Sequence, residues 1–267
     1  MLQTTRRDGL SIISAPGLQA ECGVTVAFTD RVGGAGAPPF ESLNLSFNVG
    51  DDHTVVLENR LEVAGALGFP LARWVLGRQV HGVGVSSVGS LEAARGAFDQ
   101  ASAMPGTDAL VTAEEGLLVG VLVADCLPVL MVAPAGRCVA AVHAGWRGVA
   151  RGIAPRALLA LAGRAGCRPA DVRVFVGPHI RSCCMQVDDS LAVEFARRFG
   201  EGCLVRGEAG VRLDLERACL SALYGLGVDE DNVESAGECT VCGEAYFSHR
   251  RDGGTTGRQA GFVGIVR

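Results

Sequence analysis

VGVLVADCLPVLMVAPAGRCVAAVHAGWRG, residues 119–148, is the stretch that decides the fold. It contains three apolar runs, Val119–Ala124, Val129–Ala133 and Cys138–Val142. Short runs rich in Val and Ala, without alternation of polar and apolar residues, are typical of strands covered on both faces. We therefore predict buried strands here, at the centre of an α/β fold.

The polar residues of this stretch stand where the apolar runs end. Asp125 and Cys126 follow the first run, and His143 and Arg147 follow the third. In open α/β sheets, ligands bind at the ends of strands. The sequence therefore predicts that these four residues share one local region, which we take as the candidate active site.

Composition narrows the class of protein. The 267 residues are 48% hydrophobic and 20% charged, with a net charge of -5 and ten cysteines. This balance supports a sizeable core and gives no indication of nucleic-acid binding, which requires a basic face. The run from Val119 to Ala133 is too short and too interrupted to span a membrane, and the N-terminus lacks a long apolar segment. We expect a cytoplasmic protein with mostly reduced thiols.

Elements along the rest of the chain follow from periodicity and from helix-end residues. Ser42–Ser46 alternates polar and apolar residues, which predicts a half-buried strand. Thr54 is the expected N-cap of the next helix, which Gly68 ends. We further predict strands at Trp74–Leu76 and Val172–Val176, and helices from Gly148 to about Leu161, over about Asp188–Phe199 and within Leu213–Leu226. Strands and helices mix throughout, so residues 1–267 are expected to form a single α/β domain.

His81, Cys126 and His143 form the strongest candidate site. A thiolate with two imidazoles suits Zn²⁺, and three protein ligands leave the fourth position open, as in catalytic zinc sites. A zinc ion would lower the pKa of a bound water to about 7.

Two other interpretations use the same residues. Cys126 could act as a nucleophile with His143 as its base, as in a thiol hydrolase. Copper redox chemistry is a further possibility, although five histidines are too few for several coppers in one chain. The structural alternative is a buried Cys126 thiol beside two histidines that make local hydrogen bonds.

Arginines and cysteines gather near the same motifs. The arginines suit a phosphate or carboxylate substrate, because a guanidinium group binds planar anions. They are Arg78, Arg147, Arg181, Arg250 and Arg251. Cys239-x-x-Cys242 could be half a zinc site or a redox pair, and Cys183-Cys184 could complete a set of four thiolates. A structural role is the preferred interpretation of these cysteines.

Five motifs resemble the YfiH/laccase-domain family, and the resemblance covers nearly the whole chain, from about Thr25 to Gly264. They are Arg78-Gln79-Val80-His81-Gly82, Ala124-Asp125-Cys126-Leu127-Pro128, His143-Ala144-Gly145-Trp146-Arg147-Gly148, Gly177-Pro178-His179-Ile180 with Cys183-Cys184, and Phe247-Ser248-His249-Arg250-Arg251-Asp252-Gly253. Members of that family are known as purine nucleoside phosphorylases and, earlier, as polyphenol oxidases or laccases. The chain departs from the family pattern at Thr29–Gly34 and at Met185-Gln186, where Tyr-Glu is usual.

The resemblance implies a layered α/β/α fold with a mixed sheet and a zinc ion held by His81, Cys126 and His143. It also implies phosphorolysis of adenosine, inosine, guanosine and methylthioadenosine, together with adenosine deamination. On this basis we expect Cys126, His143 and Asp125 to be catalytic. We expect Arg78, Arg147 and Arg250 to bind phosphate. The expected partners are a nucleoside and phosphate, for a monomer or homodimer. The alternatives are an amidase that edits cell-wall precursors and a copper-dependent polyphenol oxidase.

Overall fold

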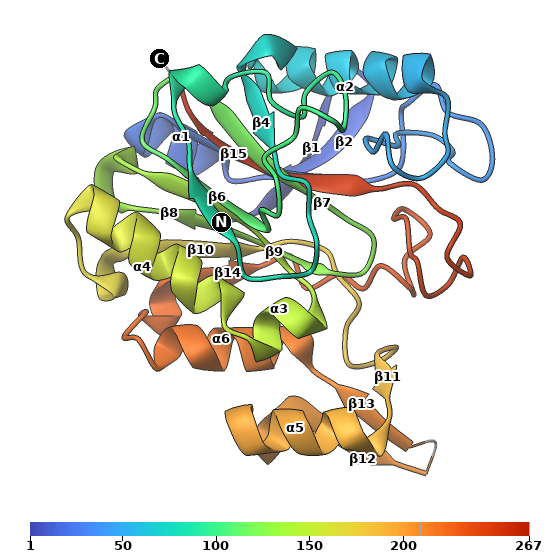
Figure 1. The fold of residues 1–267 in the computed structure, drawn as a ribbon, viewed down its shortest axis with the longest axis vertical. Helices are drawn as coiled ribbons and strands as arrows, with labels where there is room; N and C mark the ends of the chain where they lie inside the picture. Colours follow the sequence, from blue (N-terminus) through green and yellow to red (C-terminus); the bar gives the residue numbers. More distant parts are fainter. Residues whose placement is uncertain (209, 267) are drawn as a thin grey trace.

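Two six-stranded sheets packed face to face form the centre of the computed structural model, which describes residues 1–208 and 210–266 (Figure 1). Helix α2 (His53–Leu67) covers the outer face of one sheet. Helices α3 (Trp146–Ala150), α4 (Ile153–Ala165) and α6 (Leu215–Tyr224) cover the outer face of the other. The predicted layered α/β fold is confirmed, with its strands divided between two mixed sheets where one was expected.

The first sheet has the order β1-β2-β3-β15-β7-β4. Its strands are β1 (Gln3–Arg7), β2 (Leu10–Ser14), β3 (Val24–Thr29), β15 (Gln259–Ile265), β7 (Leu118–Val123) and β4 (Trp74–Leu76). All neighbours are antiparallel except β4 and β7. The C-terminal strand therefore lies between β3 and β7, and it brings the residues just before β15 beside the central stretch.

The second sheet has the order β14-β10-β8-β9-β6-β5. Its strands are β14 (Val233–Ser235), β10 (Arg173–Val176), β8 (Leu127–Val132), β9 (Val139–Ala144), β6 (Ala109–Thr112) and β5 (Val85–Ser87). The outermost pairs on both sides, β10–β14 and β5–β6, are parallel, and the inner pairs are antiparallel.

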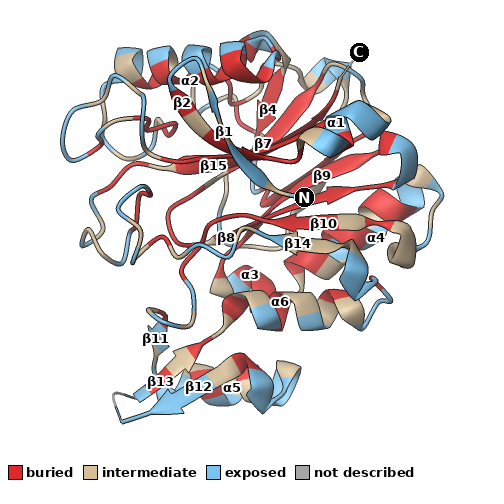
Figure 2. Ribbon diagram, turned by 180° about the vertical axis from the view of Figure 1, so that it is seen from behind, coloured by how far each residue is buried: buried red, intermediate tan, exposed pale blue. Residues whose placement is uncertain are grey.

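The central strands are apolar on both faces because both faces are covered. Side chains such as Phe28, Val121 and Leu130 fill the space between the two sheets. The opposite faces pack against the helices, so every residue of β8 and β9 is buried (Figure 2). This double burial is the physical reason for the continuous apolar runs in the sequence.

A third, three-stranded sheet lies beyond α6 at one end of the molecule (Figure 1). It has the order β11-β13-β12 and is accompanied by α5. These elements are β11 (Gln186–Val187), β13 (Gly210–Leu213), β12 (Leu204–Gly207) and α5 (Asp189–Phe199). The remaining α-helix of the described residues is α1 (Pro16–Cys22). Among residues 1–208 and 210–266, none of the helices combines the length and the apolar composition needed to span a membrane.

Two local predictions were wrong. Ser42–Ser46 is a buried loop and not a strand, because the Asn59 side chain of α2 donates hydrogen bonds to the Ser42 and Asn44 carbonyls. Two of the polar residues that alternate with the leucines bond each other, since the Asn44 side chain donates to the Ser46 carbonyl and accepts from the Ser46 N–H. The N-cap of α2 is Asp52, whose carboxylate accepts hydrogen bonds from two backbone N–H groups, and not Thr54.

Other boundaries shift for identifiable reasons. Strand β8 begins at Leu127 and includes Pro128, although proline usually ends a strand because it cannot donate to the ladder. The Pro128 carbonyl still accepts a hydrogen bond, from Gly177. The helix expected after Gly148 is split in two at Gly152, whose φ of 81° lies in the left-handed region. The strand at Trp74–Leu76 and the end of α2 at Gly68 are confirmed. All ten cysteines are free thiols, as expected.

Candidate active site

A cavity of about 560 Å³ opens where the central strands end. This size is typical of a site for a small molecule. Its lining includes six of the seven predicted site residues: His81, Asp125, Cys126, His143, Arg147 and Arg250. Arg78 is exposed and is not part of the lining.

His81, Cys126 and His143 meet at one side of this cavity. One potential ligand atom from each side chain lies within 4.8 Å of the others. Cys126 stands in the connection from β7 to β8, His143 on β9 and His81 in the loop after β4. The two imidazole rings are 4.8 Å apart and nearly perpendicular, so both can direct a nitrogen at one point beside the sulfur.

The backbone around these residues is held in an uncommon conformation. His81 has φ of 56° and Asp125 has φ of 86°, both in the left-handed region that non-glycine residues rarely adopt. Such strain persists only where the surrounding contacts enforce it, and it is typical of functional sites.

Asp108, just before β6, supplies those contacts. Its buried carboxylate accepts hydrogen bonds from the backbone N–H groups of Val80, His81 and Gly82. The same carboxylate lies 2.8 Å from His143 Nδ1. Asp108 therefore fixes the loop that carries His81 and leaves Nε2 of His143 as the nitrogen free to bind a metal, as in carboxylate–histidine–metal sites.

Gly145 lies directly against the three side chains. A Cβ atom at this position would stand 2.9 Å from His81 Cδ2 and 3.1 Å from Cys126 Sγ. Both distances are shorter than ordinary contacts. The glycine of the His143-Ala144-Gly145 motif is thus required by the close approach of the backbone to the cluster.

The charges of the cluster are strongly coupled. Burial raises the pKa of the Cys126 thiol, but His143 and His81 outweigh this effect and lower it to about 6. Burial lowers the pKa of His143, while the Cys126 thiolate and the Asp108 carboxylate raise it to about 9. Cys126 is therefore a thiolate at neutral pH, which is the form that binds metals and attacks carbonyl groups.

Asp125 contacts the protein through both of its oxygens. Oδ1 accepts a hydrogen bond of 2.6 Å from the Thr240 hydroxyl, and Oδ2 accepts one of 2.7 Å from the backbone N–H of Arg250. These contacts tie the loop before β15 to the Cys126 loop. Both oxygens are thus engaged by the protein, which favours a positioning role for Asp125 over the catalytic role expected from the sequence.

Three arginines also line the cavity. Arg147 and Arg250 line it as predicted, together with Arg258, which sequence reasoning missed. Burial lowers the pKa of Arg258, although the Cys126 and Asp125 charges oppose that shift. Three cations around one cavity suit an anionic substrate group such as phosphate.

Two further residues of the site had no role assigned from the sequence. Asp108 is a lone acid before a buried apolar run, and that position was its only local signal. Gln79 lines the cavity and exchanges two hydrogen bonds of 2.8 Å with the backbone of Leu122, which joins the His81 loop to β7.

The chain is similar to a known protein family and to named relatives. The family model described as multi-copper polyphenol oxidoreductase laccase matches residues 25–266. Purine nucleoside phosphorylase YlmD of Geobacillus stearothermophilus is 41% identical over 247 residues, which cover 91% of this chain and 90% of that protein. A purine nucleoside phosphorylase of Streptomyces coelicolor is 39% identical over 241 residues, covering 90% of this chain and 95% of its own length.

Solved structures share the fold over nearly the whole chain. The crystal structure of YlmD from Geobacillus stearothermophilus superposes with a TM-score of 0.92 at 38% identity, covering 100% of this chain and 99% of that one. The crystal structure of a hypothetical protein YfiH from Bacillus licheniformis gives a TM-score of 0.91 at 35% identity, covering 97% and 98%.

Proposed function

The chain belongs to the YfiH/laccase-domain family, and from this premise we propose that it is a zinc-dependent purine nucleoside phosphorylase. The observation that carries the proposal is one cavity that combines His81, Cys126 and His143 with the guanidinium groups of Arg147, Arg250 and Arg258. Relatives named purine nucleoside phosphorylase support the substrate class. The cavity draws its lining from Ser46 to Arg258, which supports a single catalytic domain.

The donor set fits a zinc ion. A thiolate and two neutral imidazoles are ligands that zinc prefers, and three of them leave a position open for water or phosphate. The absent Cβ of Gly145 leaves room beside the two ligand side chains that it faces. A bound zinc ion would supply a Lewis acid and lower the pKa of a water or substrate oxygen.

In phosphorolysis, a phosphate oxygen forms a bond to C1′ of the ribose while the bond from C1′ to the purine nitrogen breaks. The electron pair of that bond leaves with the purine, which takes up a proton. Arg147, Arg250 and Arg258 would hold the phosphate dianion and orient one oxygen toward C1′. We assign Asp125 to positioning, because its contacts fix the backbone of Arg250. For Arg78, the phosphate-binding role stays a prediction.

The proposed nucleosides are adenosine, inosine, guanosine and methylthioadenosine, with adenosine deamination as a second activity. In deamination, a water oxygen replaces the exocyclic amino group and ammonia leaves. Both reactions use an oxygen nucleophile, phosphate in the first and water in the second, and a zinc ion held by His81, Cys126 and His143 would lower the pKa of such an oxygen.

A thiol amidase is the second candidate. It is favoured by the lowered pKa of Cys126 beside His143, which is the arrangement of a thiolate nucleophile and its base. It competes directly with the zinc proposal, since a sulfur bound to zinc is not a free nucleophile. A copper oxidase would use the same three ligands, because two imidazoles and a thiolate also suit copper.

The test is chromatographic. We would incubate the purified protein with adenosine in the presence and absence of phosphate, before and after treatment with a chelator. The expected result is adenine release that requires phosphate, is lost on chelation and returns with zinc. Inosine without base release would indicate deamination alone. Oxygen uptake with copper in the protein would favour the oxidase.

Variants assign the roles. His81→Ala and His143→Ala should lose the metal and the activity together. Arg258→Gln should keep the metal and raise the KM for phosphate about tenfold or more, since a charged hydrogen bond contributes roughly 1.5–3 kcal/mol. Wild-type turnover in His81→Ala would refute the zinc role.

A further inference from the structure

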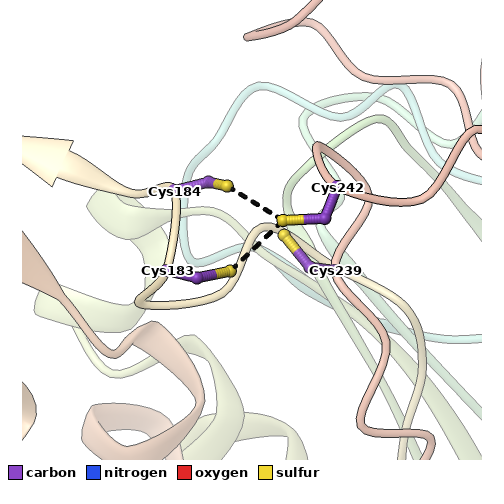
Figure 3. Close-up of side chains that lie close together, drawn as sticks. All are labelled: Cys183, Cys184, Cys239 and Cys242. Carbon is purple, nitrogen blue, oxygen red and sulfur yellow. Dashed lines mark hydrogen bonds between the residues drawn. The ribbon is translucent and has the colours of Figure 1, made fainter.

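Four cysteines outside the active site meet at one point on the surface. They are Cys183 and Cys184, in the loop between β10 and β11, and Cys239 and Cys242, in the loop after β14 (Figure 3). Each pair comes from a different loop, and all four sulfur atoms lie within 4.8 Å of one another. All four are free thiols. We propose that this cluster binds one structural Zn²⁺ ion, separate from the active-site metal.

The distances between the sulfurs fit a zinc ion. The Cys184 and Cys242 Sγ atoms are 3.2 Å apart, and those of Cys183 and Cys242 are 3.6 Å apart. A tetrahedral zinc ion with Zn–S bonds of about 2.3 Å places its sulfurs about 3.8 Å apart. The sulfurs are too far apart for disulfide bonds, which measure about 2.0 Å.

Backbone pairing brings the two loops together. Strands β10 and β14 are parallel, and their pairing continues beyond the strands through a bridge between His179 and Cys239. The His179 N–H donates to the Glu238 carbonyl, and the Thr240 N–H donates to the His179 carbonyl. The positions of the four cysteines are therefore set by ordered backbone and not by chance contact of mobile side chains.

The backbone also prepares Cys239 to act as a ligand. The backbone N–H groups of Arg181, Val241 and Cys242 point at its sulfur. N–H groups directed at a sulfur favour its thiolate form. Two of these donors lie within the Cys-x-x-Cys segment itself, a spacing that structural zinc sites use.

Nearby arginines offset the charge that such a site would carry. Zinc binding to four thiols releases four protons and leaves a net charge of about -2. The guanidinium of Arg181 donates to the Gly237 carbonyl, that of Arg250 to the Cys184 carbonyl and that of Arg251 to the Thr240 carbonyl. Three cations thus contact the same two loops.

The ion would also stiffen one wall of the active site. Thr240, next to Cys239, donates its hydroxyl hydrogen to Asp125, and Met185, next to Cys184, lines the cavity. Arg250, a proposed phosphate ligand, contacts the carbonyls of Cys184 and Gln186. A zinc ion between the loops would hold these groups in place without taking part in the reaction.

The first experiment counts metal ions in the intact protein by mass spectrometry of the metals. We expect two zinc ions per chain in the wild type, one in the double variant Cys239→Ser/Cys242→Ser and one in His81→Ala. Cys167→Ser, a half-buried thiol outside both clusters, should keep two. Failure of the active-site proposal is distinguishable, because it would change the His81→Ala result and leave the effect of the serine variant intact.

Cobalt substitution gives a second readout that does not depend on how the serine variant folds. Replacing zinc by Co²⁺ in His81→Ala should give the intense charge-transfer bands of a four-thiolate site. Three results would overturn the proposal: zinc content unchanged in the serine variant, iron in place of zinc in the wild type, or two disulfides in the freshly purified chain.

Discussion

Replacing Asp108 with Asn tests whether the buried carboxylate organises the candidate metal site. The carboxylate accepts hydrogen bonds of 2.9 Å from His81 N–H and 2.8 Å from Gly82 N–H, and it lies 2.8 Å from His143 Nδ1. An amide has only one accepting oxygen. In one orientation its NH₂ group faces the Gly82 N–H, and in the other it faces the donors of His81 and His143. In either orientation, the amide NH₂ group faces at least one other hydrogen-bond donor in a buried site, and neither donor finds an acceptor there.

The expected loss follows from these contacts. Removing a partner that orients a metal-binding histidine typically weakens metal affinity or activity about 10–100-fold. At roughly 1.4 kcal/mol per tenfold change, this corresponds to about 1.4–2.8 kcal/mol. Asn keeps the size of the side chain, so the effect reports on charge and hydrogen bonding and not on a cavity.

The assay is a zinc titration against a competing chelator, followed by kcat/KM for phosphorolysis. Asp231→Asn, an exposed site on a short helical turn, is the matched control and should leave both quantities unchanged. If Asp108→Asn binds zinc and turns over substrate within twofold of the wild type, the argument that Asp108 positions His81 and His143 is wrong.

Three further predictions concern close packing, a buried cation and a thiolate. Gly145→Ala should lower zinc affinity at least tenfold, because the new Cβ would stand 2.9 Å from a ligand imidazole; Gly163→Ala, on an open helix face, should instead stabilise the protein by about 0.5–1 kcal/mol. Arg60→Ala leaves three buried carbonyl acceptors without their hydrogen-bond donor. Thermal unfolding should therefore show a free energy of unfolding lower by about 3 kcal/mol or more and a Tm lower by roughly 6–12 °C. An unchanged Tm would contradict this. In the metal-free protein, the rate of Cys126 alkylation should rise with pH as the thiolate forms and reach half its maximum near the pKa of about 6. Cys167, whose pKa is raised by burial, should react slowly at pH 7. Equal rates at the two thiols would refute the lowered pKa of Cys126.

Much of the candidate site could be predicted because its residues follow buried strands. Cys126 and His143 stand at the ends of apolar runs, and strand ends are where such side chains converge. The Cys-x-x-Cys pair could likewise be recognised, and Cys183-Cys184 could be named as its possible partners. That the two pairs meet was decided only by the folded sheet, in which β10 and β14 are neighbours.

The sequence by itself determined the local elements: the apolar runs that became β7, β8 and β9, the strand at Trp74–Leu76 and the helix over Asp189–Phe199. Local periodicity suffices there, because burial on one or both faces leaves its pattern in adjacent residues. The tertiary structure alone decided the contacts between distant segments. Asp108 meets His143 only because β6 pairs with β9, and Arg258 reaches the cavity only because β15 lies beside β7. Such contacts depend on strand order and register, which no periodicity within a single segment records.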